Sequence, residues 1–480
     1  MLKKIRLACL AVLPIPAFVS TEMHAAPPVL YQEHQEFLDD VQERTFNWFW
    51  ENTHPESGLV PDRAPTESFS SIAAVGFGLT TIPIGIERGF ITREEGLERV
   101  LATLRFFDQA PQGPEPRGNT GHKGFYYHFL DMENGERYLE VELSTIDTAL
   151  FILGALFCQS YFDGPEQAEV EIRQLAETLY RRVEWDWALV RPSLMCMGWM
   201  PETGFIPADY EGYNEAMFLY LLALASPTHP IPEDSWERFV WSYHWADFNQ
   251  VEHVAFAPMF GHQYTQSWID MRGIQDTYMR SRGIDYFENS RRAAHAQRNY
   301  AIQNPLGWRD YGPNIWGLTA CDGPADVLLE YKGRMRMFFT YRARGAGADY
   351  TTDDGTIAPT AAAGSIAFAP EIVIPALQEM QQRYGEHVYT EHGFVDAFNP
   401  SFDFADRELQ NGHIVEGLGW FGKDHLGIDQ GPIVLMIENY RSGFVWEVMR
   451  RNPHIVRGLQ RAGFSGGWLT ELKPQPVAVD

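Results

Sequence analysis

Apolar residues recur along most of this chain every three or four positions, which is the spacing of amphipathic helices. In residues 33–50 this pattern puts Leu38 and Trp48 on one face, between polar positions. Thr92 and Glu95 have the spacing of a capping box at the start of another such helix. Amphipathic helices are likewise predicted over residues 93–107, 166–187, 284–303 and 371–384.

A second kind of segment is apolar nearly all round. Residues 148–157 (TALFILGALF), 216–225 (AMFLYLLALA) and 432–437 (PIVLMI) have no polar face. A helix of this kind has to be buried on every side, and these segments are shorter than the roughly 20 apolar residues that span a bilayer. Amphipathic outer helices that alternate with apolar inner helices predict an all-α, double-layered helical barrel of about a dozen elements.

The segments between the predicted helices are long and rich in Gly, Pro and aromatic residues. Long loops in a compact domain are usually functional or disordered, and the aromatic content of these indicates a sugar-binding surface on a helical scaffold. Residues 333–352 alternate enough to allow a short β-hairpin, and no boundary divides residues 30–472 into domains. The loops cover residues 54–68, 110–141, 192–214, 254–282, 305–328 and 340–364.

The first residues have the features of an export signal. Lys3, Lys4 and Arg6 precede a short apolar stretch, and Ala25 offers a small residue for cleavage. We therefore expect a signal peptide over residues 1–25, with an uncleaved anchor as the alternative. The protein is then expected to be periplasmic or secreted, from a Gram-negative bacterium.

Composition narrows the class of partner. A formal net charge of −26 argues against nucleic acid and anionic membranes, because both attract basic surfaces. Aromatic residues make up 14% of the chain, enough to supply platforms for sugar rings as well as a core. Cys158, Cys196 and Cys321 are odd in number and far apart, so we expect buried free thiols and no disulfide framework.

An acidic residue stands at the start of each apolar segment: Asp147, Glu215 and Asp429. If these helices line a barrel, the three acids reach its interior. A carboxylate at a helix N-terminus is also stabilised by the helix dipole, by about 0.3–1 kcal/mol. Helix capping is therefore the alternative role for each of them.

Glycoside hydrolysis requires two carboxyl groups in unequal environments, one protonated and one ionised. Glu215, at the edge of an apolar helix and close to Tyr213, should have its pKa raised by desolvation, which fits the acid. Asp396 lies in a loop with Gly, Asn and Pro and is the candidate base, for which we expect a more hydrated setting. The sequence spacing does not fix this pairing.

Other motifs are weaker. The DDGT sequence at 353–356 resembles a calcium loop but lacks the Gly and Glu that such a loop requires. His122 and His128 have no third partner at zinc-ligand spacing, so we interpret them as sugar-binding or structural residues. Neither a serine-hydrolase elbow nor a phosphate-binding loop is present. We expect no metal and no cofactor.

Two further sets of residues could each have either a structural role or a sugar-binding role. Arg272, Asp276 and Arg280, four positions apart, fit either an ion-pair ladder on a helix or contacts with sugar hydroxyls. Tryptophans in the loops either pack or stack on glucose rings. These tryptophans are Trp199, Trp268, Trp308, Trp316 and Trp420.

Longer motifs resemble the glucoamylase-like domain family, over nearly all of residues 30–470. They include GWMPETGFIPADYEGYNEAMFLYLLALASPTHPI at 198–231, FGHQYTQSWIDMRGIQD at 260–276 and GIDQGPIVLMIENYRSGFVW at 427–446. GFYYHFLDMENGER, ELSTIDTAL, WGLTACDGP and YGEHVYTEHGFVDAFNP continue the pattern.

This family is similar to glycoside hydrolase family 144, the bacterial β-1,2-glucanases. The resemblance implies an (α/α)6 barrel and a secreted or periplasmic inverting enzyme that acts on linear β-1,2-glucan without a metal cofactor. It implies Glu215 as the acid and Asp396 as the candidate base, with Asp147 also in a family motif. We expect the glucan to contact Glu142, His122, Tyr127, His128, Asp131, Tyr213, Trp268, Arg272, Trp316, Trp420 and Asp429.

The leading hypothesis is endo-acting hydrolysis of β-1,2-glucosidic bonds by a monomer. Its partner is then a β-glucan, with no nucleic acid and no membrane insertion after signal cleavage. Three alternatives stay open: exo action that releases sophorose, the same fold acting on another linkage, and a non-catalytic periplasmic glucan-binding protein.

Overall fold

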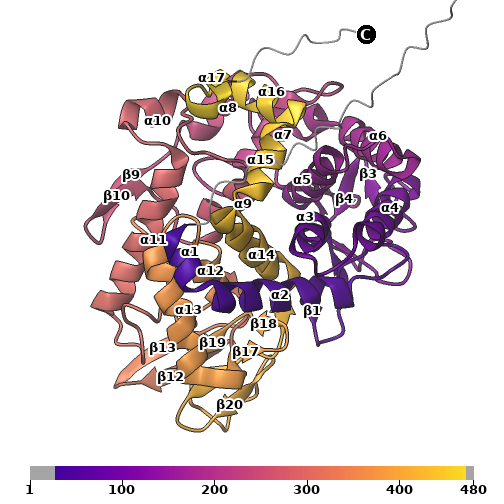
Figure 1. Cartoon of the computed structure of the whole chain (residues 1–480). Helices are drawn as coiled ribbons and strands as arrows, with labels where there is room; N and C mark the ends of the chain where they lie inside the picture. The colour runs from indigo at the N-terminus through magenta and orange to yellow at the C-terminus, as the bar shows by residue number, and fades with distance from the viewer. Residues whose placement is uncertain (1–27, 472–480) are drawn as a thin grey trace, which may run out of the picture.

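The computed structural model describes residues 28–471, so the expected signal peptide lies outside the described residues. Helices dominate the fold (Figure 1). Along the chain, helices with one buried face alternate with helices buried nearly all round. The buried helices are α3 (Ile72–Arg88), α5 (Thr145–Tyr161), α7 (Met217–Ala225), α9 (Phe260–Trp268), α12 (Pro359–Ala363) and α14 (Gly427–Arg441). The half-buried helices between them are α2 (Gln35–Asn52), α4 (Arg93–Gln109), α6 (Gln167–Arg182), α8 (Asp234–Val240), α11 (Tyr286–Gln303) and α13 (Pro370–Tyr384). Shorter helices are α1 (Val29–Glu33), α10 (Thr277–Arg282), α15 (Phe444–Arg450), α16 (Pro453–Arg461) and α17 (Gly467–Glu471).

The amphipathic and apolar helices predicted from periodicity are confirmed, with ends that move by a few residues. The predicted capping box at α4 is present: Glu95 N donates to Thr92 Oγ1 over 3.2 Å, and Thr92 N donates to Glu95 Oε2 over 2.8 Å. Helix α5 begins three residues before the apolar run, so Asp147 lies inside its first turn. Helix α3 was not predicted.

Helices α3 and α5 pack side by side with their backbones in contact (Figure 1). A Cβ atom added at Gly76 would lie 2.3 Å from the carbonyl oxygen of Leu150, and one added at Gly154 would lie 2.2 Å from that of Gly76. Because both limits are set by backbone atoms, no rotamer change could relieve either contact. The two glycines therefore fix how closely these helices approach.

Gly76→Ala is expected to lower the free energy of unfolding by about 1–3 kcal/mol or more, the usual cost of overpacking a core. Gly312→Ala is the matched control, because a Cβ atom there would meet only Asp310 O, at 3.7 Å. Denaturant unfolding of the two variants beside the wild type measures the difference. Equal midpoints for all three proteins would contradict this account of the helix contact.

Short strands lie in the segments that connect the helices, which corrects the all-α prediction. The largest sheet has the order β3 (Gly121–His122), β4 (Phe125–Tyr127), β6 (Leu143–Ser144), β7 (Gly198–Met200) and β8 (Gly204–Phe205). A three-stranded sheet has the order β19 (Phe398–Asn399), β21 (Gly419–Phe421) and β20 (His413–Val415). The pairs are β1 (Arg63–Ala64) with β22 (His425–Leu426), β2 (Ser70–Ser71) with β5 (Phe129–Leu130), β9 (Trp245–Phe248) with β10 (Val251–Val254), β11 (Ala320–Cys321) with β14 (Arg342–Ala343), β12 (Val327–Tyr331) with β13 (Arg334–Phe338), β15 (Gly345–Ala346) with β16 (Thr351–Thr352), and β17 (Tyr389–Thr390) with β18 (Gly393–Phe394).

The expected hairpin at 333–352 is displaced. The observed hairpin joins β12 and β13 over residues 327–338, and residues 339–352 instead form β14, β15 and β16. The buried pair of Arg344 and Asp354 holds this second part, because the guanidinium donates to both carboxylate oxygens over 2.8 Å.

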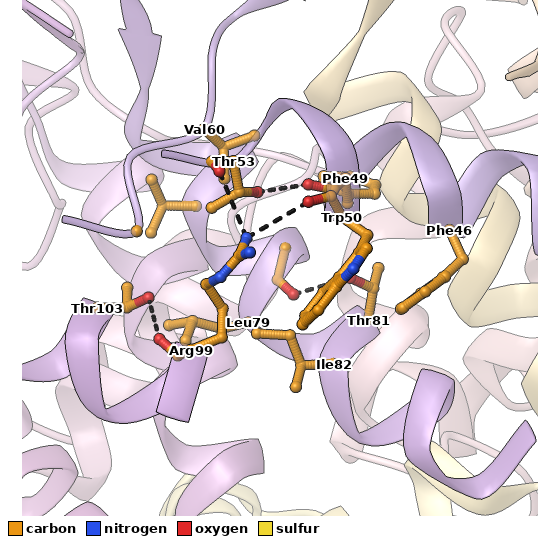
Figure 2. Close-up of a pocket in the computed structure, with 13 residues that line it drawn as sticks. Phe46, Phe49, Trp50, Thr53, Val60, Leu79, Thr81, Ile82, Arg99 and Thr103 are labelled. Atoms are coloured by element: carbon orange, nitrogen blue, oxygen red, sulfur yellow. Dashed lines mark hydrogen bonds between the residues drawn. The ribbon is translucent and has the colours of Figure 1, made fainter. Parts of the chain in front are cut away.

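A hollow between α2, α3 and α4 is lined by apolar side chains, three threonines and Arg99 (Figure 2). Arg99 lies over the ring of Trp50 at 4.4 Å and donates to the carbonyl oxygens of Trp50 and Thr53, both over 3.4 Å. These carbonyls belong to the C-terminal end of α2, so Arg99 caps that helix. None of the candidate acids lines this hollow, and we assign it a structural role.

Cys158, Cys196 and Cys321 are free and buried, as predicted. Every helix within residues 28–471 is too short or too polar to cross a bilayer.

Candidate active site

Acidic side chains from the predicted helix starts meet loop residues at the end of the fold where α5, α7 and α14 begin. Asp147 and Asp429 each lie in the first turn of a buried helix and are only 3% exposed. Capping does not explain Asp147, because Ser144 is the N-cap and accepts a hydrogen bond from Asp147 N over 3.2 Å. The Ser144 hydroxyl also donates to the Asp147 carboxylate.

His128 lies between the carboxyl groups of Glu142 and Asp147. Its Nδ1 is 2.8 Å from Glu142 Oε1, and its Nε2 is 3.6 Å from Asp147 Oδ2. Burial alone would lower the pKa of His128, but Asp147, Glu142 and Asp62 outweigh it and raise that pKa to about 9. Burial would raise the pKa of Glu142, but His128 outweighs it and the pKa is lowered. At neutral pH this group is therefore a histidinium held between carboxylates.

Glu215 lies two residues before α7, in a turn fixed by its neighbours. Asn214 Oδ1 accepts a hydrogen bond from Ala216 N over 2.9 Å, and Thr265 Oγ1 donates to Glu215 O over 3.3 Å. Burial raises the pKa of Glu215 to about 7, and the charge of Asp147 adds to this rise. Glu215 thus keeps its proton close to neutral pH, as an acid catalyst requires.

Asp396 and Asp429 form a carboxyl pair. The two groups hydrogen-bond each other, and Asp322 N donates to Asp396 Oδ2 over 2.7 Å. Burial, followed by the charge of Asp322, raises the pKa of Asp396 to about 7, while burial and Asp396 raise that of Asp429 much further. The shared proton therefore lies more on Asp429 than on Asp396, and the two carboxyl groups titrate as one pair.

The expectation of a hydrated setting for Asp396 was wrong. Its side chain is 2% exposed, because the loop between β18 and β19 is covered by the strands around it. Within residues 28–471, Asp396 Oδ1 and Asp429 Oδ2 receive no hydrogen bond from an N–H group or a hydroxyl, which fits a proton shared between the two carboxyl groups.

Arg63 supplies a positive charge beside this pair. Its Nη1 donates to Asp322 Oδ2 over 2.7 Å, and its Nε donates to Asp62 Oδ2 over 3.0 Å. Asn411 Nδ2 also donates to Asp322 Oδ2 over 2.7 Å. Burial would lower the pKa of Arg63, but Asp322, Asp62 and Asp396 outweigh it and raise the pKa. Arg63 therefore stays charged and partly neutralises the carboxyl groups around it.

Tyr264 on α9 lies within electrostatic range of both groups of acids. Burial raises the pKa of its hydroxyl, and Asp429, Glu215 and Asp147 raise it further. The backbone agrees with this arrangement, because Gly427 N donates to Asp62 O over 2.9 Å and Ile72 N donates to His128 O over 3.2 Å. The histidine group with Glu215 and the aspartate pair with Arg63 therefore make up one candidate site.

Several predicted sugar-contacting residues lie elsewhere. Trp268 and Trp420 are fully buried and donate through Nε1, to Thr80 Oγ1 over 2.9 Å and to Asn411 O over 2.8 Å respectively. Trp316 is 1% exposed within an apolar cluster. These three rings are covered by the protein, which favours the packing interpretation for them.

Arg272 is also structural, since it donates to both oxygens of Asp270 over 2.8 Å and lies 4.2 Å from the ring of Trp446. Asp276 is the N-cap of α10 and accepts from Met279 N over 2.8 Å. The three residues Arg272, Asp276 and Arg280 therefore form no ladder.

The remaining predicted contacts lie near the site without touching the acids. Tyr127 is buried beneath the guanidinium of Arg137, and His122 packs 5.2 Å from Trp199 on the largest sheet. Tyr213 packs against His262 with ring centroids 5.0 Å apart, two residues before Glu215.

The Asp131 carboxylate has a local role. Its Oδ1 accepts from Glu133 N over 2.9 Å and from Asn134 N over 3.2 Å, which closes a turn of the chain. This turn accounts for the aspartate without a sugar ligand.

The two carboxylates of the DDGT motif are already bound by other side chains of the protein. Asp353 accepts from the hydroxyls of Tyr300 and Tyr311, both over 2.8 Å, and Asp354 pairs with Arg344. Within residues 28–471, no group of three His, Cys, Asp or Glu side chains is arranged to hold a metal ion.

Sequence reasoning missed Asp62, Arg63, Asp322 and Tyr264. Asp322 and Tyr264 do lie inside the motifs WGLTACDGP and FGHQYTQSWIDMRGIQD, so position within a motif was a usable signal for both. No motif was recognised around Asp62 and Arg63.

The fold and the site together define a helix-rich protein with buried carboxyl groups suited to acid–base chemistry. Residues 207–453, just over half of the chain, match the family model described as "Putative glucoamylase". The chain belongs to this family, which confirms the resemblance to the glucoamylase-like domain.

Solved structures of similar proteins come from several bacteria. The putative glucoamylase of Bacteroides uniformis is 30% identical, with a TM-score of 0.76 over 91% of this chain and 98% of that one. The endo-β-1,2-glucanase of Chitinophaga pinensis, solved with sophorotriose and glucose, is 27% identical, with a TM-score of 0.76 over 90% of this chain and 98% of that one.

A relative from Parabacteroides distasonis is described as an exo β-1,2-glucooligosaccharide sophorohydrolase (non-reducing end). It is 28% identical over 462 residues, which cover 89% of this chain. The chain spans 58% of the length of that relative.

Proposed function

We propose that this protein is a glycoside hydrolase that cleaves the β-1,2-glucosidic bonds of linear β-1,2-glucan with inversion. The observation that carries the proposal is that Glu215, whose raised pKa lets it keep a proton close to neutral pH, lies in the same site as the carboxyl pair of Asp396 and Asp429, of which Asp396 ionises more readily. The names of the Chitinophaga and Parabacteroides relatives support the choice of glucan.

In the proposed reaction, Glu215 donates its proton to the glycosidic oxygen as the bond to the anomeric carbon breaks. Asp396 removes a proton from a water molecule, whose oxygen attacks the anomeric carbon from the opposite side. Inverting enzymes hold such carboxyl groups roughly 6.5–9.5 Å apart to leave room for the water, or farther when a relay intervenes. Asp429 keeps its proton and donates a hydrogen bond to Asp396, which stabilises the ionised base.

The other side chains of the site have supporting roles in this proposal. Asp147 raises the pKa of Glu215, and His128 balances the charges of Asp147 and Glu142. Glu142, His128 and Tyr213 lie on the Glu215 side and are proposed to contact sugar hydroxyls, while Asp429 does so beside Asp396.

We further propose that the alternating helices form an (α/α)6 barrel, in a single catalytic domain over residues 30–472. Six nearly fully buried helices, each preceded by a helix with one exposed face, support this arrangement. We propose that the enzyme acts as a monomer in the periplasm or outside the cell, after removal of residues 1–25.

Incubation of the purified protein with linear β-1,2-glucan, beside β-1,3-, β-1,4- and α-linked glucans, tests the function. Cleavage of the β-1,2-glucan alone is expected, with the α-anomer as the first product by NMR. A ladder of oligosaccharides indicates the endo action that we propose, as in the Chitinophaga relative, and sophorose alone indicates exo action. Binding of the glucan without any cleavage would identify a glucan-binding protein and overturn the proposal.

Asp147→Asn is expected to move the alkaline limb of the pH profile of kcat/KM to lower pH. The charge of Asp147 raises the pKa of Glu215, so its removal lets Glu215 lose the catalytic proton at lower pH. The acid limb, which follows ionisation of Asp396, is expected to stay in place. Asp163→Asn is the matched control, because Asp163 lies just beyond the opposite end of α5. A profile of Asp147→Asn that coincides with the wild type would show that Asp147 does not tune the acid.

A further inference from the structure

Two exposed tyrosines lie in the segment that follows the β12–β13 hairpin and have no part in the mechanism above. Tyr341 is 50% exposed and Tyr350 is 43% exposed, whereas most aromatic side chains within residues 28–471 are buried. Both lie in residues 339–352, the part of the expected hairpin that forms β14, β15 and β16 instead. A large, half-exposed ring beside buried acids is a typical platform for a ligand.

Strand pairing places Tyr341 next to the aspartate pair. Strands β11 and β14 are antiparallel, with Cys321 opposite Arg342. The next position in this register puts Tyr341 opposite Asp322, the residue whose backbone N–H donates to Asp396 Oδ2. The charges of Asp429, Asp396 and Asp62 all act on the Tyr341 hydroxyl, in agreement with this position.

Tyr350 lies in the turn between β15 and β16. Gly347 N donates to Tyr350 O over 3.0 Å, which closes this turn. Strand pairing therefore places Tyr341, and not Tyr350, beside the candidate base.

Arg344 holds Tyr341 and Asp322 in one rigid unit. Its guanidinium is fully buried and donates to the carbonyl oxygens of Phe339 and Thr340, both over 3.1 Å, immediately before Tyr341. The same group donates to Cys321 O over 2.7 Å and to Asp322 O over 3.2 Å. One side chain therefore fixes the backbone on both sides of the β11–β14 pair.

We propose that Tyr341 is a sugar-contacting residue, whose ring stacks on a glucosyl unit bound at the Asp396 side of the scissile bond. Arg344 is its positioning residue. This inference rests on the proposed function, since it takes the glucan as the ligand. A ring held on a fixed backbone loses little conformational entropy on binding, so its contact contributes to affinity.

Tyr341→Ala is expected to raise KM for linear β-1,2-glucan about tenfold with little change in kcat, because a stacking contact binds substrate and transition state alike. Tyr341→Phe keeps the ring and is expected to stay close to the wild type. Tyr440→Ala is the matched control: Tyr440 is a half-buried tyrosine toward the other end of α14, about 16 Å along the helix from Asp429.

Arg344→Lys tests the positioning role through a double-mutant cycle. It is expected to raise KM by itself, and to raise it no further when combined with Tyr341→Ala, because both changes remove the same contact. Fully additive effects on KM would show that Arg344 does not act through Tyr341. Thermal unfolding of each variant separates loss of the contact from loss of the fold.

Binding of β-1,2-gluco-oligosaccharides to Glu215→Gln, with and without Tyr341→Ala, gives a second measurement by calorimetry. An approximately tenfold weaker Kd is expected when the ring is removed. An unchanged Kd and KM, in a protein whose wild type cleaves the glucan, would overturn the inference and leave the proposed function standing. A wild type that neither binds nor cleaves the glucan would overturn both.

Discussion

Glu215→Gln is expected to lower kcat on linear β-1,2-glucan at least a thousandfold, within the roughly 10²–10⁴-fold range that general acid catalysis contributes. Glutamine keeps the size of the side chain and its hydrogen bonding but has no acidic proton to give the leaving oxygen. Initial rates and calorimetric affinity for the glucan measure the effect, and affinity is expected to remain close to that of the wild type.

Glu211→Gln is the control for this change. Glu211 lies four residues earlier, is exposed, and pairs with Arg238 over 2.9 Å at the surface. It should retain full activity. If Glu215→Gln instead keeps most of its turnover while folding normally, the proton comes from another group and the assignment of the acid is wrong.

Asp396→Asn is expected to lower kcat by a similar factor, because no other group in the pair is ionised to remove a proton from water. Azide, a nucleophile that needs no deprotonation, is expected to restore cleavage and to give a glycosyl azide of inverted configuration. Rates with and without azide, together with NMR of the product, measure both effects. A purely structural loss would show no such rescue.

Asp429→Asn separates the roles within the carboxyl pair. Asparagine still donates a hydrogen bond toward Asp396, so this change is expected to be milder than Asp396→Asn. Asp403→Asn, at an exposed position seven residues after Asp396, should leave kcat unchanged. If Asp429→Asn is the more damaging change and azide rescues that variant instead, Asp429 is the base.

The helices were predictable where the sequence carried a strong period or a long apolar run, as in TALFILGALF of α5. Helix α3 escaped prediction because Gly76, Gly78, Pro83 and Gly85 fall within it, and these residues usually interrupt helices. Two of the same glycines face neighbouring elements at contact distance, Gly76 against α5 and Gly85 against Phe46 of α2. Local propensity and close packing conflict there, and packing prevails.

The short strands were missed for a different reason. Strands of two or three residues, such as β6 and β7, contain no repeat of the alternating pattern by which a strand is identified. Their pairing depends on partners distant in the chain, and single-sequence patterns carry no information about those partners.

Some residues of the candidate site were likewise predictable from the sequence, and others were not. Asp147, Glu215 and Asp429 were predictable because each adjoins an apolar helix. Arg63 and Asp322 were not, because their contact joins residues 259 positions apart. The tryptophans show a further limit: loop composition alone does not distinguish a ring buried in the core, such as that of Trp268, from an exposed ring, such as that of Tyr341.

The pairing of β1 with β22 also bears on how this protein matures. Thr66 N donates to Asp424 Oδ1 over 2.9 Å across 358 positions of the chain, and Arg63 reaches the aspartates from the same early segment. During synthesis, no nascent fragment that ends before α14 contains a complete site. In a refolding experiment, glucanase activity should therefore appear later than the helical circular dichroism signal. The return of activity would then show when the early and late segments of the chain have come together.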